Sequence, residues 1–214
     1  ILGNETFGVR VLTSATGVRI SRNSISGNGA LGIDLGTGGV TPNDPTDADT
    51  GPNGLQNFPV LAQAVTNGAA TVVRGTLRSL PNQAFLVELF ASPACDASGN
   101  GEGAVYLGSV QTTTDASGLA AFEARLPGTT AGWVATATAT QSATGNTSEF
   151  SACAAIGAPA CAADFNLDGF LDFFDYNDFT AAFENGGPGA DFNADGFVDF
   201  FDYDGFVAAF QTGC

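Results

Sequence analysis

The chain has 214 residues and a formal net charge of −16, because 22 acidic residues stand against six arginines and no lysine. Such an excess of negative charge repels nucleic acids and anionic membrane surfaces, so neither is expected as a partner. The absence of histidine and lysine also excludes Ser-His-Asp and Cys-His catalysis, histidine-ligated zinc and Schiff-base chemistry, and we predict no catalytic residue in this chain.

The chain starts at Ile1 rather than at a methionine, and we expect it to be the C-terminal portion of a longer protein. No apolar run approaches the roughly 20 residues that a membrane-spanning helix needs, so no membrane insertion is expected. The four cysteines have neither the CxxC spacing of a redox motif nor that of a zinc site. They predict disulfide bonds and a secreted or cell-surface protein.

Residues 1–40 hold three very short strand patterns bounded by glycine and asparagine: GVRV at 8–11, GVRI at 17–20 and GIDL at 32–35. The first and third are 24 residues apart, about one coil of a parallel β-helix with three short strands per turn. Residues 1–40 are therefore predicted to be the terminal coils of a parallel β-helix.

Stacked coils would point four apolar side chains inward, namely Val9, Val11, Ile33 and Leu35. They would also place Arg10 beside Asp34 on the outside, as a surface ion pair. The phrase NSISGNGALGIDLG resembles the last coils of bacterial right-handed β-helix proteins. That resemblance implies either a polysaccharide lyase or glycosidase, with Arg19 or Asp34 at the margin of an active site, or a non-catalytic adhesin or stalk.

Residues 41–58 are dense in Pro, Gly, Asn and Asp and are predicted to be a linker built from turns. Four oxygen-bearing side chains in this segment are close in sequence: Asp44, Asp47, Asp49 and Asn53. Hard cations take oxygen ligands from closely spaced carboxylates, so a third calcium site at 44–53 is one interpretation. A plain solvated bridge is the other.

Residues 59–153 show strand patterns at fairly even spacing, which predict a β-sandwich. The seven expected strands are 59–65, 70–78, 84–91, 104–111, 118–126, 132–140 and 147–152. Alternation predicts that Phe85, Val87 and Leu89 share one face and that Ala120, Phe122, Ala124 and Leu126 share another. The stretch VATATATQSATGNTSEFSAC resembles Ig-like spacer modules of bacterial surface proteins, which implies a structural role.

Residues 161–214 contain the same twelve-residue phrase twice, DFNLDGFLDFFD at 164–175 and DFNADGFVDFFD at 191–202. Oxygen-bearing side chains stand at positions 1, 3, 5, 9 and 12, and glycine stands at position 6, which is the spacing of an EF-hand calcium loop. Position 7 would contribute a backbone carbonyl. The predicted ligands of two calcium ions are Asp164, Asn166, Asp168, Phe170, Asp172 and Asp175, then Asp191, Asn193, Asp195, Phe197, Asp199 and Asp202.

Helical patterns follow each phrase, but the short Gly- and Pro-broken segments before each phrase predict no entering helix. After the phrases, aromatic side chains recur at three- and four-residue steps: Phe173, Tyr176, Phe179 and Phe183, then Phe200, Tyr203, Phe206 and Phe210. A loop followed by a helix, given twice with Asp at position 12, resembles the dockerin module. The ending YDGFVAAFQTGC is similar to phenylalanine-rich bacterial variants that terminate in Gly-Cys.

The dockerin resemblance implies attachment to a cohesin-like or other surface or scaffold protein. Dockerins carry small polar or aliphatic partner-selecting residues at positions 10 and 11, where this chain has Phe173 with Phe174 and Phe200 with Phe201. We expect at least one phenylalanine of each pair to be exposed as an apolar anchor. The alternatives are that both pack into the small core between the helices, or that the calcium sites are structural and dock nothing.

The cysteine pairing that keeps each bond within one predicted domain joins Cys95 to Cys153 and Cys161 to Cys214. The expected fold is mainly β with a small α C-terminal module. We expect a non-catalytic region of a secreted bacterial protein that docks in a calcium-dependent way. The alternative is the C-terminal part of a β-helix carbohydrate-active enzyme that acts in polysaccharide catabolism.

Overall fold

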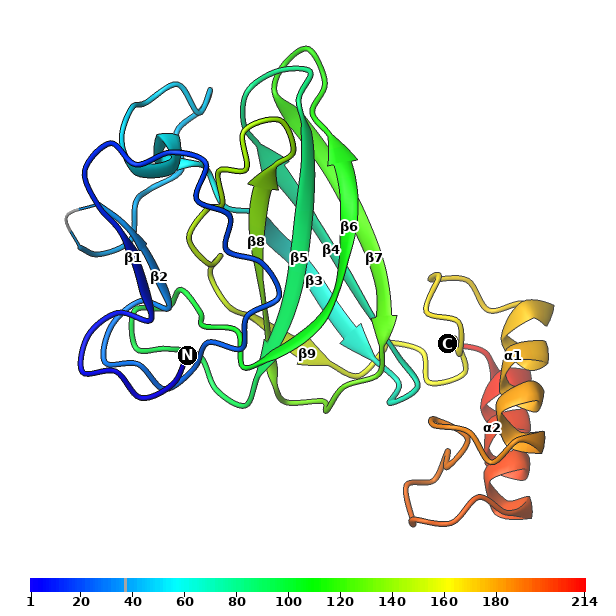
Figure 1. Ribbon diagram of the computed structural model, residues 1–214. Coiled ribbons are helices and arrows are strands. Elements are labelled where there is room, and N and C mark those ends of the chain that lie inside the picture. The colour runs from blue at the N-terminus through cyan, green and yellow to red at the C-terminus, as the bar shows by residue number, and fades with distance from the viewer. Residues whose placement is uncertain (37) are drawn as a thin grey trace. The chain divides into compact units, whose positions relative to one another are not determined.

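The computed structural model describes residues 1–36 and 38–214 and is mainly β, with two helices near the C-terminus (Figure 1). The chain divides into two compact units. Unit 1 contains Ile1–Ala64, Val73–Ala124 and Trp133–Ala155, and unit 2 contains Val65–Val72, Arg125–Gly132 and Ile156–Cys214. Unit 2 thus contains the ends of four strands together with the whole of the C-terminal repeat.

The described residues form nine strands, one short 3-10 helix and two α-helices. The strands are β1 (Val9–Val11), β2 (Ile33–Leu35), β3 (Val60–Thr66), β4 (Ala70–Arg78), β5 (Ala84–Ser92), β6 (Val105–Thr113), β7 (Leu119–Pro127), β8 (Val134–Gln141) and β9 (Ala154–Gly157). The helices are η1 (Pro52–Leu55), α1 (Phe173–Glu184) and α2 (Phe200–Thr212).

The N-terminal segment folds into two stacked turns with the expected offset. β1 pairs with β2 in parallel, Val9 opposite Ile33 and Val11 opposite Leu35, and a parallel bridge between Leu2 and Ser26 keeps the same register. The amide of Asn4 donates to the Oδ1 of Asn28 at 2.8 Å, again across 24 residues. The stacking of 8–11 on 32–35 is confirmed, whereas 17–20 forms no strand in the described part of the chain.

Arg10 and Asp34 do lie side by side, with Nε and Oδ2 2.8 Å apart, but the prediction that Asp34 faces solvent is wrong because its side chain is fully buried. Ile25 exchanges two backbone hydrogen bonds with Gly103, so the second turn is joined to the segment between β5 and β6. Ile33 and Leu35 belong to the same apolar cluster as Phe90 and Phe150. The two turns therefore share a core with the strands of unit 1.

Residues 41–58 are not a solvated bridge. Their one regular element is η1, yet Asp47, Gln56 and Asn57 are buried, and Asn53 is completely so. The Asn53 amide donates to the carbonyls of Val18 and Thr147 at 2.8 and 2.9 Å. Side-chain hydrogen bonds from Asn and Gln thus fix this segment where regular backbone ladders are missing.

Seven strands form one hydrogen-bonded sheet in the order β6-β5-β8-β9-β3-β4-β7. Leu77 of β4 packs against Phe85 of β5 and Ala139 of β8, so strands from the two halves of this order face each other across a core. Phe85, Val87 and Leu89 are completely buried, and the alternating residues of β7 from Ala120 to Leu126 are buried as well. Both predicted faces are confirmed.

The predicted seventh strand at 147–152 is wrong, since the last strand of the sheet is β9. Ser148 and Ser151 explain the difference. Their hydroxyls accept hydrogen bonds from the backbone N–H groups of Ala139 and Ala137, each at 2.9 Å. Serine side chains thus take the place of the carbonyls that a regular ladder would use.

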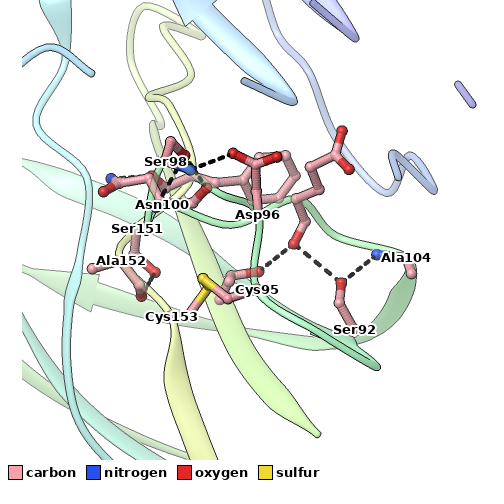
Figure 2. The surroundings of a disulfide bond; sticks show 12 residues. Ser92, Cys95, Asp96, Ser98, Asn100, Ala104, Ser151, Ala152 and Cys153 are labelled. Carbon is pink, nitrogen blue, oxygen red and sulfur yellow. Dashed lines mark hydrogen bonds between the residues drawn. A yellow bond between two sulfur atoms is a disulfide. The ribbon is translucent and has the colours of Figure 1, made fainter. Parts of the chain in front are cut away.

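Both predicted disulfides are present. Cys95 is bonded to Cys153 in unit 1, with the Cα atoms 6.0 Å apart, and Cys161 to Cys214 in unit 2, with the Cα atoms 5.2 Å apart. Figure 2 shows the first bond beside the turn in which the Asp96 carboxylate accepts from the N–H of Ser98. None of the helices in the described chain is long and apolar enough to cross a membrane.

Candidate metal-binding loops

The duplicated phrase forms two loops, and each leads directly into a helix. Loop 1 (164–175) enters α1 and loop 2 (191–202) enters α2, and the described residues 158–172 and 185–199 contain no helix before either loop. Asp172 and Asp199 cap the two helices, and each forms a reciprocal capping box with the aspartate three residues later. The predicted order of loop and then helix, twice, is confirmed.

Loop 1 is closed by its own carboxylates. Asp164 accepts from the N–H groups of Asp168 and Gly169 at 3.1 and 3.0 Å, and Asn166 Oδ1 also accepts from Asp168 at 2.9 Å. Asp175 accepts from the N–H groups of Asn166 and Asp172 at 3.0 and 2.9 Å. The side chains at positions 1, 3 and 12 therefore turn toward the interior of the loop.

Loop 2 repeats these bonds. Asp191 accepts from the N–H groups of Asp195 and Gly196 at 3.0 and 2.9 Å. Asp202 accepts from those of Asn193 and Asp199 at 3.0 and 2.8 Å. Gly169 and Gly196 have φ values of 92° and 93°, a backbone conformation that favours glycine, as position 6 requires. The sequence repeat is thus also a repeat of geometry.

Two carboxyl groups, at position 1 of loop 1 and position 12 of loop 2, have shifted pKa values. Burial raises the pKa of Asp164, which means that the negative form is disfavoured there. Backbone N–H groups, first that of Asn193, hold the pKa of Asp202 below its ordinary value. A cation next to Asp164 would offset the cost of burying its negative charge, because an opposite charge favours the ionised carboxyl.

The donors of each loop are carboxylate, amide and carbonyl oxygens, the set that calcium takes. The carboxylate oxygens are, however, not drawn into a tight group. Among the described residues, a set of three carboxylates whose oxygens lie within 4.8 Å of one another occurs only at Asp44, Asp47 and Asp49. The loops thus offer calcium donors of the right chemistry in the right order, without the carboxylate oxygens being gathered into one group.

The Asp44, Asp47 and Asp49 group brings together three of the four residues proposed for a third calcium site. Asn53 is not one of them, because its amide is bonded to Val18 and Thr147. Asp47 already accepts from Gln56, from the N–H of Asn57 and from the hydroxyl of Ser79. Burial raises the pKa of Asp47 and of Asp49.

The helices pair through equivalent residues of the two copies. Phe179 and Phe206, 27 residues apart, stack at 3.9 Å between ring centroids, and the hydroxyls of Tyr176 and Tyr203 are 2.6 Å apart. Tyr176 meets Phe210 as Tyr203 meets Phe183. These contacts show that α1 and α2 are antiparallel and related by a pseudo-twofold axis.

Six phenylalanines surround the two loops and face solvent. Their exposed fractions are 72% for Phe170, 69% for Phe173, 63% for Phe174, 72% for Phe197, 69% for Phe200 and 69% for Phe201. The alternative that the pairs at positions 10 and 11 fill the core between the helices is wrong, because Phe179 and Phe206 occupy that core. At least one phenylalanine of each pair was expected to be exposed, and all four are.

Sequence reasoning did not find the residues that seat loop 1. Asn67 donates to the carbonyl of Phe165 at 2.7 Å, and Arg125 donates to the carbonyl of Asn166. Leu167 is 2% exposed and packs with Val65, Ala70 and Val72. The one available signal was position 4 of the phrase, where the copies differ as Leu167 and Ala194.

No protein-family model matches the sequence, and no curated protein is similar to it. Among solved structures, macromomycin is similar over 47% of this chain and 97% of its own, with 21% sequence identity and a TM-score of 0.23. A likeness this distant carries no argument about fold or function.

Proposed function

We propose that residues 161–214 form a calcium-dependent, dockerin-like docking module of a secreted or cell-surface bacterial protein. The two loops bind one calcium ion each, and the exposed phenylalanines beside them bind a cohesin-like or other scaffold protein. The observation that supports this most directly is the repeated geometry: two loops with the same hydrogen bonds and the same three exposed phenylalanines each. The strand-rich part of the chain then serves as an Ig-like spacer.

The first effect of bound calcium would be to neutralise negative charge in residues 161–214. Residues 161–214 contain eleven acidic residues and no basic residue, so their mutual repulsion opposes folding unless cations neutralise it. Two calcium ions would supply four positive charges at the loops, and ion binding would be coupled to folding. The affinity expected for EF-hand loops of this kind is on the order of 10⁻⁷ to 10⁻⁵ M.

Docking would act through the phenylalanines. Burying an exposed aromatic side chain removes a large apolar area from water, and aromatic anchors carry much of the binding energy at protein interfaces. The acidic residues around them favour a partner whose apolar patch has a basic rim. The two disulfides support a secreted protein, since such bonds persist in oxidising compartments.

Calorimetry of the full chain with calcium tests the metal proposal. We expect saturable binding at both loops, abolished in the double variant Asp164→Ala and Asp191→Ala and kept in Asp49→Asn, which removes a carboxylate of the other acidic group. Circular dichroism should show a calcium-dependent gain of helix in the wild type and in Asp49→Asn, but not in the double variant. No heat and no change in helix content on adding calcium would refute a calcium-dependent module.

A second candidate rests on the constant 24-residue offset between the two N-terminal turns. This offset favours the terminal coils of a β-helix, and hence a parent protein that acts on polysaccharides. An Asn ladder such as Asn4 with Asn28 is a repeat that further coils would continue. Activity assays on plant and algal polysaccharides with the parent protein, with and without this region, distinguish an enzyme from a non-catalytic stalk.

A further inference from the structure

The two loops differ in surroundings although they match in sequence and internal bonding. Within the twelve positions the copies differ at position 4, Leu167 against Ala194, and at position 8, Leu171 against Val198. Leu167 is buried, whereas Ala194 is exposed. The substitution at position 4 therefore coincides with a difference in packing.

A seat for loop 1, formed by the β3–β4 turn and the end of β7, lies within unit 2. Asn67 connects the turn to the loop: its Oδ1 accepts from the N–H groups of Ala69 and Ala70 at 3.0 and 2.9 Å, while its Nδ2 donates to the carbonyl of Phe165 at 2.7 Å. The turn and the loop are thus held by the two ends of one amide side chain.

Arg125 and Leu167 complete this seat. Arg125 donates to the carbonyl of Asn166, next to Leu167 in the apolar cluster of Val65, Ala70 and Val72. In loop 2 the equivalent carbonyls, of Phe192 and Asn193, have no side-chain donor within the part of the chain that the structure describes. Loop 1 is therefore fixed from outside as well as from within.

The backbone at position 4 is strained in both loops, which gives the difference in packing between Leu167 and Ala194 an energetic consequence. Position 4 has a left-handed φ in both loops, 59° at Leu167 and 60° at Ala194. Residues with a Cβ atom are disfavoured in that region, so each loop carries a conformational cost. Burial of the Leu167 side chain offsets the cost in loop 1, whereas the exposed methyl group of Ala194 offers little compensation.

We propose that the two loops bind calcium unequally: loop 1 is a tight structural site preorganised by its seat, and loop 2 is the weaker site whose occupancy follows the calcium concentration. A site that is already ordered loses less conformational entropy on binding an ion. Loop 2 has only its internal hydrogen bonds, so a bound ion would have to supply more of its order. The inference rests on the proposed function, because it requires that both loops bind calcium.

This division makes loop 2 the calcium sensor of the docking surface. Phe197 lies within loop 2, and Phe200 and Phe201 begin α2, whose cap Asp199 is a predicted ligand. Filling loop 2 would fix these three phenylalanines relative to their counterparts around loop 1. The positive charge of Arg125 lies near loop 1 and opposes calcium binding there, against the proposed order of affinities. Its side chain is exposed, so water and salt screen this repulsion.

A site-resolved calcium titration of the full wild-type chain tests the proposal without any variant. The backbone amides of Gly169 and Gly196 report loops 1 and 2 separately by nuclear magnetic resonance. We expect Gly169 to reach its calcium-bound position at a free calcium concentration at least tenfold lower than Gly196. Equal midpoints, or an earlier transition at Gly196, would overturn the inference and leave the proposed function in place. If neither amide responds to calcium, the proposed function fails with it.

Variants at position 4 test the cause. Leu167→Ala gives loop 1 the residue of loop 2 and should weaken calcium binding at Gly169 about tenfold without moving the midpoint of Gly196. Leu167→Met, which keeps a long apolar side chain at position 4, should bind calcium at Gly169 about as tightly as the wild type. The matched change Ala194→Leu, which has no seat to fill, should leave both midpoints in place. If Leu167→Ala lowers thermal stability but leaves the Gly169 midpoint unchanged, the seat does not set calcium affinity and the proposal is wrong.

Discussion

Phe179 and Phe206 occupy the same position in the two copies of the repeat and stack on each other, with ring centroids 3.9 Å apart and an angle of 7° between the planes. Both side chains are completely buried. Phe165 and Phe192, also equivalent, pack edge-on against this pair from the two loops. The core between the helices is thus built from pairs of equivalent residues, so the repeated loop and helix together supply both halves.

Replacement of Phe179 by alanine should destabilise unit 2 by about 3–5 kcal/mol, because it removes a buried aromatic ring and leaves a cavity. Phe173→Ala is the matched control in the same helix, with 69% of the side chain exposed. It should change the free energy of unfolding by no more than about 0.5 kcal/mol. Chemical denaturation followed by circular dichroism measures both, and equal losses in the two variants would contradict this assignment of core and surface.

The repeat was the part of the fold that the sequence predicted best, because every loop position is constrained by local chemistry. The twelve-residue phrase and the aromatic stripe that follows it agreed on where α1 begins, and the structure adds that Asp172, a predicted ligand, caps this helix. The periodic stripe was less accurate at its first member: Phe173 was expected with Phe179, but it lies in the first turn of the helix and faces solvent. A three- or four-residue spacing predicts which residues share a helix face, but it does not show which of them lie beyond the reach of the packing partner.

Long-range contacts were the part that the sequence did not predict. Asp34 was expected outside because the alternation in GIDL is a local pattern, whereas its burial depends on residues more than a hundred positions away, such as Glu149 beside Leu35. The burial of 41–58 has the same origin, since Asn53 finds its partners at Val18 and Thr147. Turn-forming residues predict local conformation and carry no information on which distant groups they meet.

Intact-mass and peptide mapping under non-reducing conditions should show two linked pairs, Cys95 with Cys153 and Cys161 with Cys214. Replacing Cys161 and Cys214 by serine should destabilise unit 2 by about 4 kcal/mol, the value for closing a loop of this length in the unfolded chain. The same double change at Cys95 and Cys153 should instead affect unit 1. A peptide joining Cys153 to Cys161 would contradict both assignments.

The stability of unit 1 should rise as the pH falls through the raised pKa values of two buried carboxyl groups toward the ordinary values of about 4. Burial raises the pKa of Glu149 and of Asp47. A raised pKa means that the folded state holds the proton more tightly than the unfolded state does. The resulting stabilisation is complete below the ordinary values of about 4 and is lost as the pH rises through the raised pKa.

The opposite behaviour is expected from Asp115, whose pKa is lowered by hydrogen bonds from Ser117 and Leu119. Its stabilisation is present above the ordinary value and is lost as the pH falls through the lowered pKa, so at the acid end of the range it opposes the gain from Glu149 and Asp47. Glu149→Gln removes one titrating group and should flatten the dependence of stability on pH between pH 7 and the ordinary value of about 4. Melting curves across this range measure the effect; an unchanged slope in the variant would show that Glu149 does not contribute.

The last prediction concerns the docking surface. Replacing Phe173, Phe174, Phe200 and Phe201 together by serine should leave calcium affinity nearly unchanged, because these exposed side chains offer no oxygen to an ion and bury little area in the free chain. The same four changes should abolish binding to the partner, since aromatic anchors carry most of the energy of such an interface. The partner is first identified by calcium-dependent capture from the cell envelope of the source organism. Calorimetry with calcium, and then with the purified partner, measures the calcium affinity and the partner affinity separately.

Two half-variants, each with only one of the two phenylalanine pairs replaced by serine, complete this test. The pseudo-twofold axis makes the pair at 173–174 equivalent to the pair at 200–201. If a partner binds in either of two orientations related by a half-turn, each half-variant should keep most of the affinity. If the seat of loop 1 restricts the partner to one orientation, one half-variant should lose far more than the other. A quadruple variant that keeps full affinity for the partner would exclude the phenylalanine surface as the docking site, and one that loses calcium binding would show that these side chains hold the loops in register.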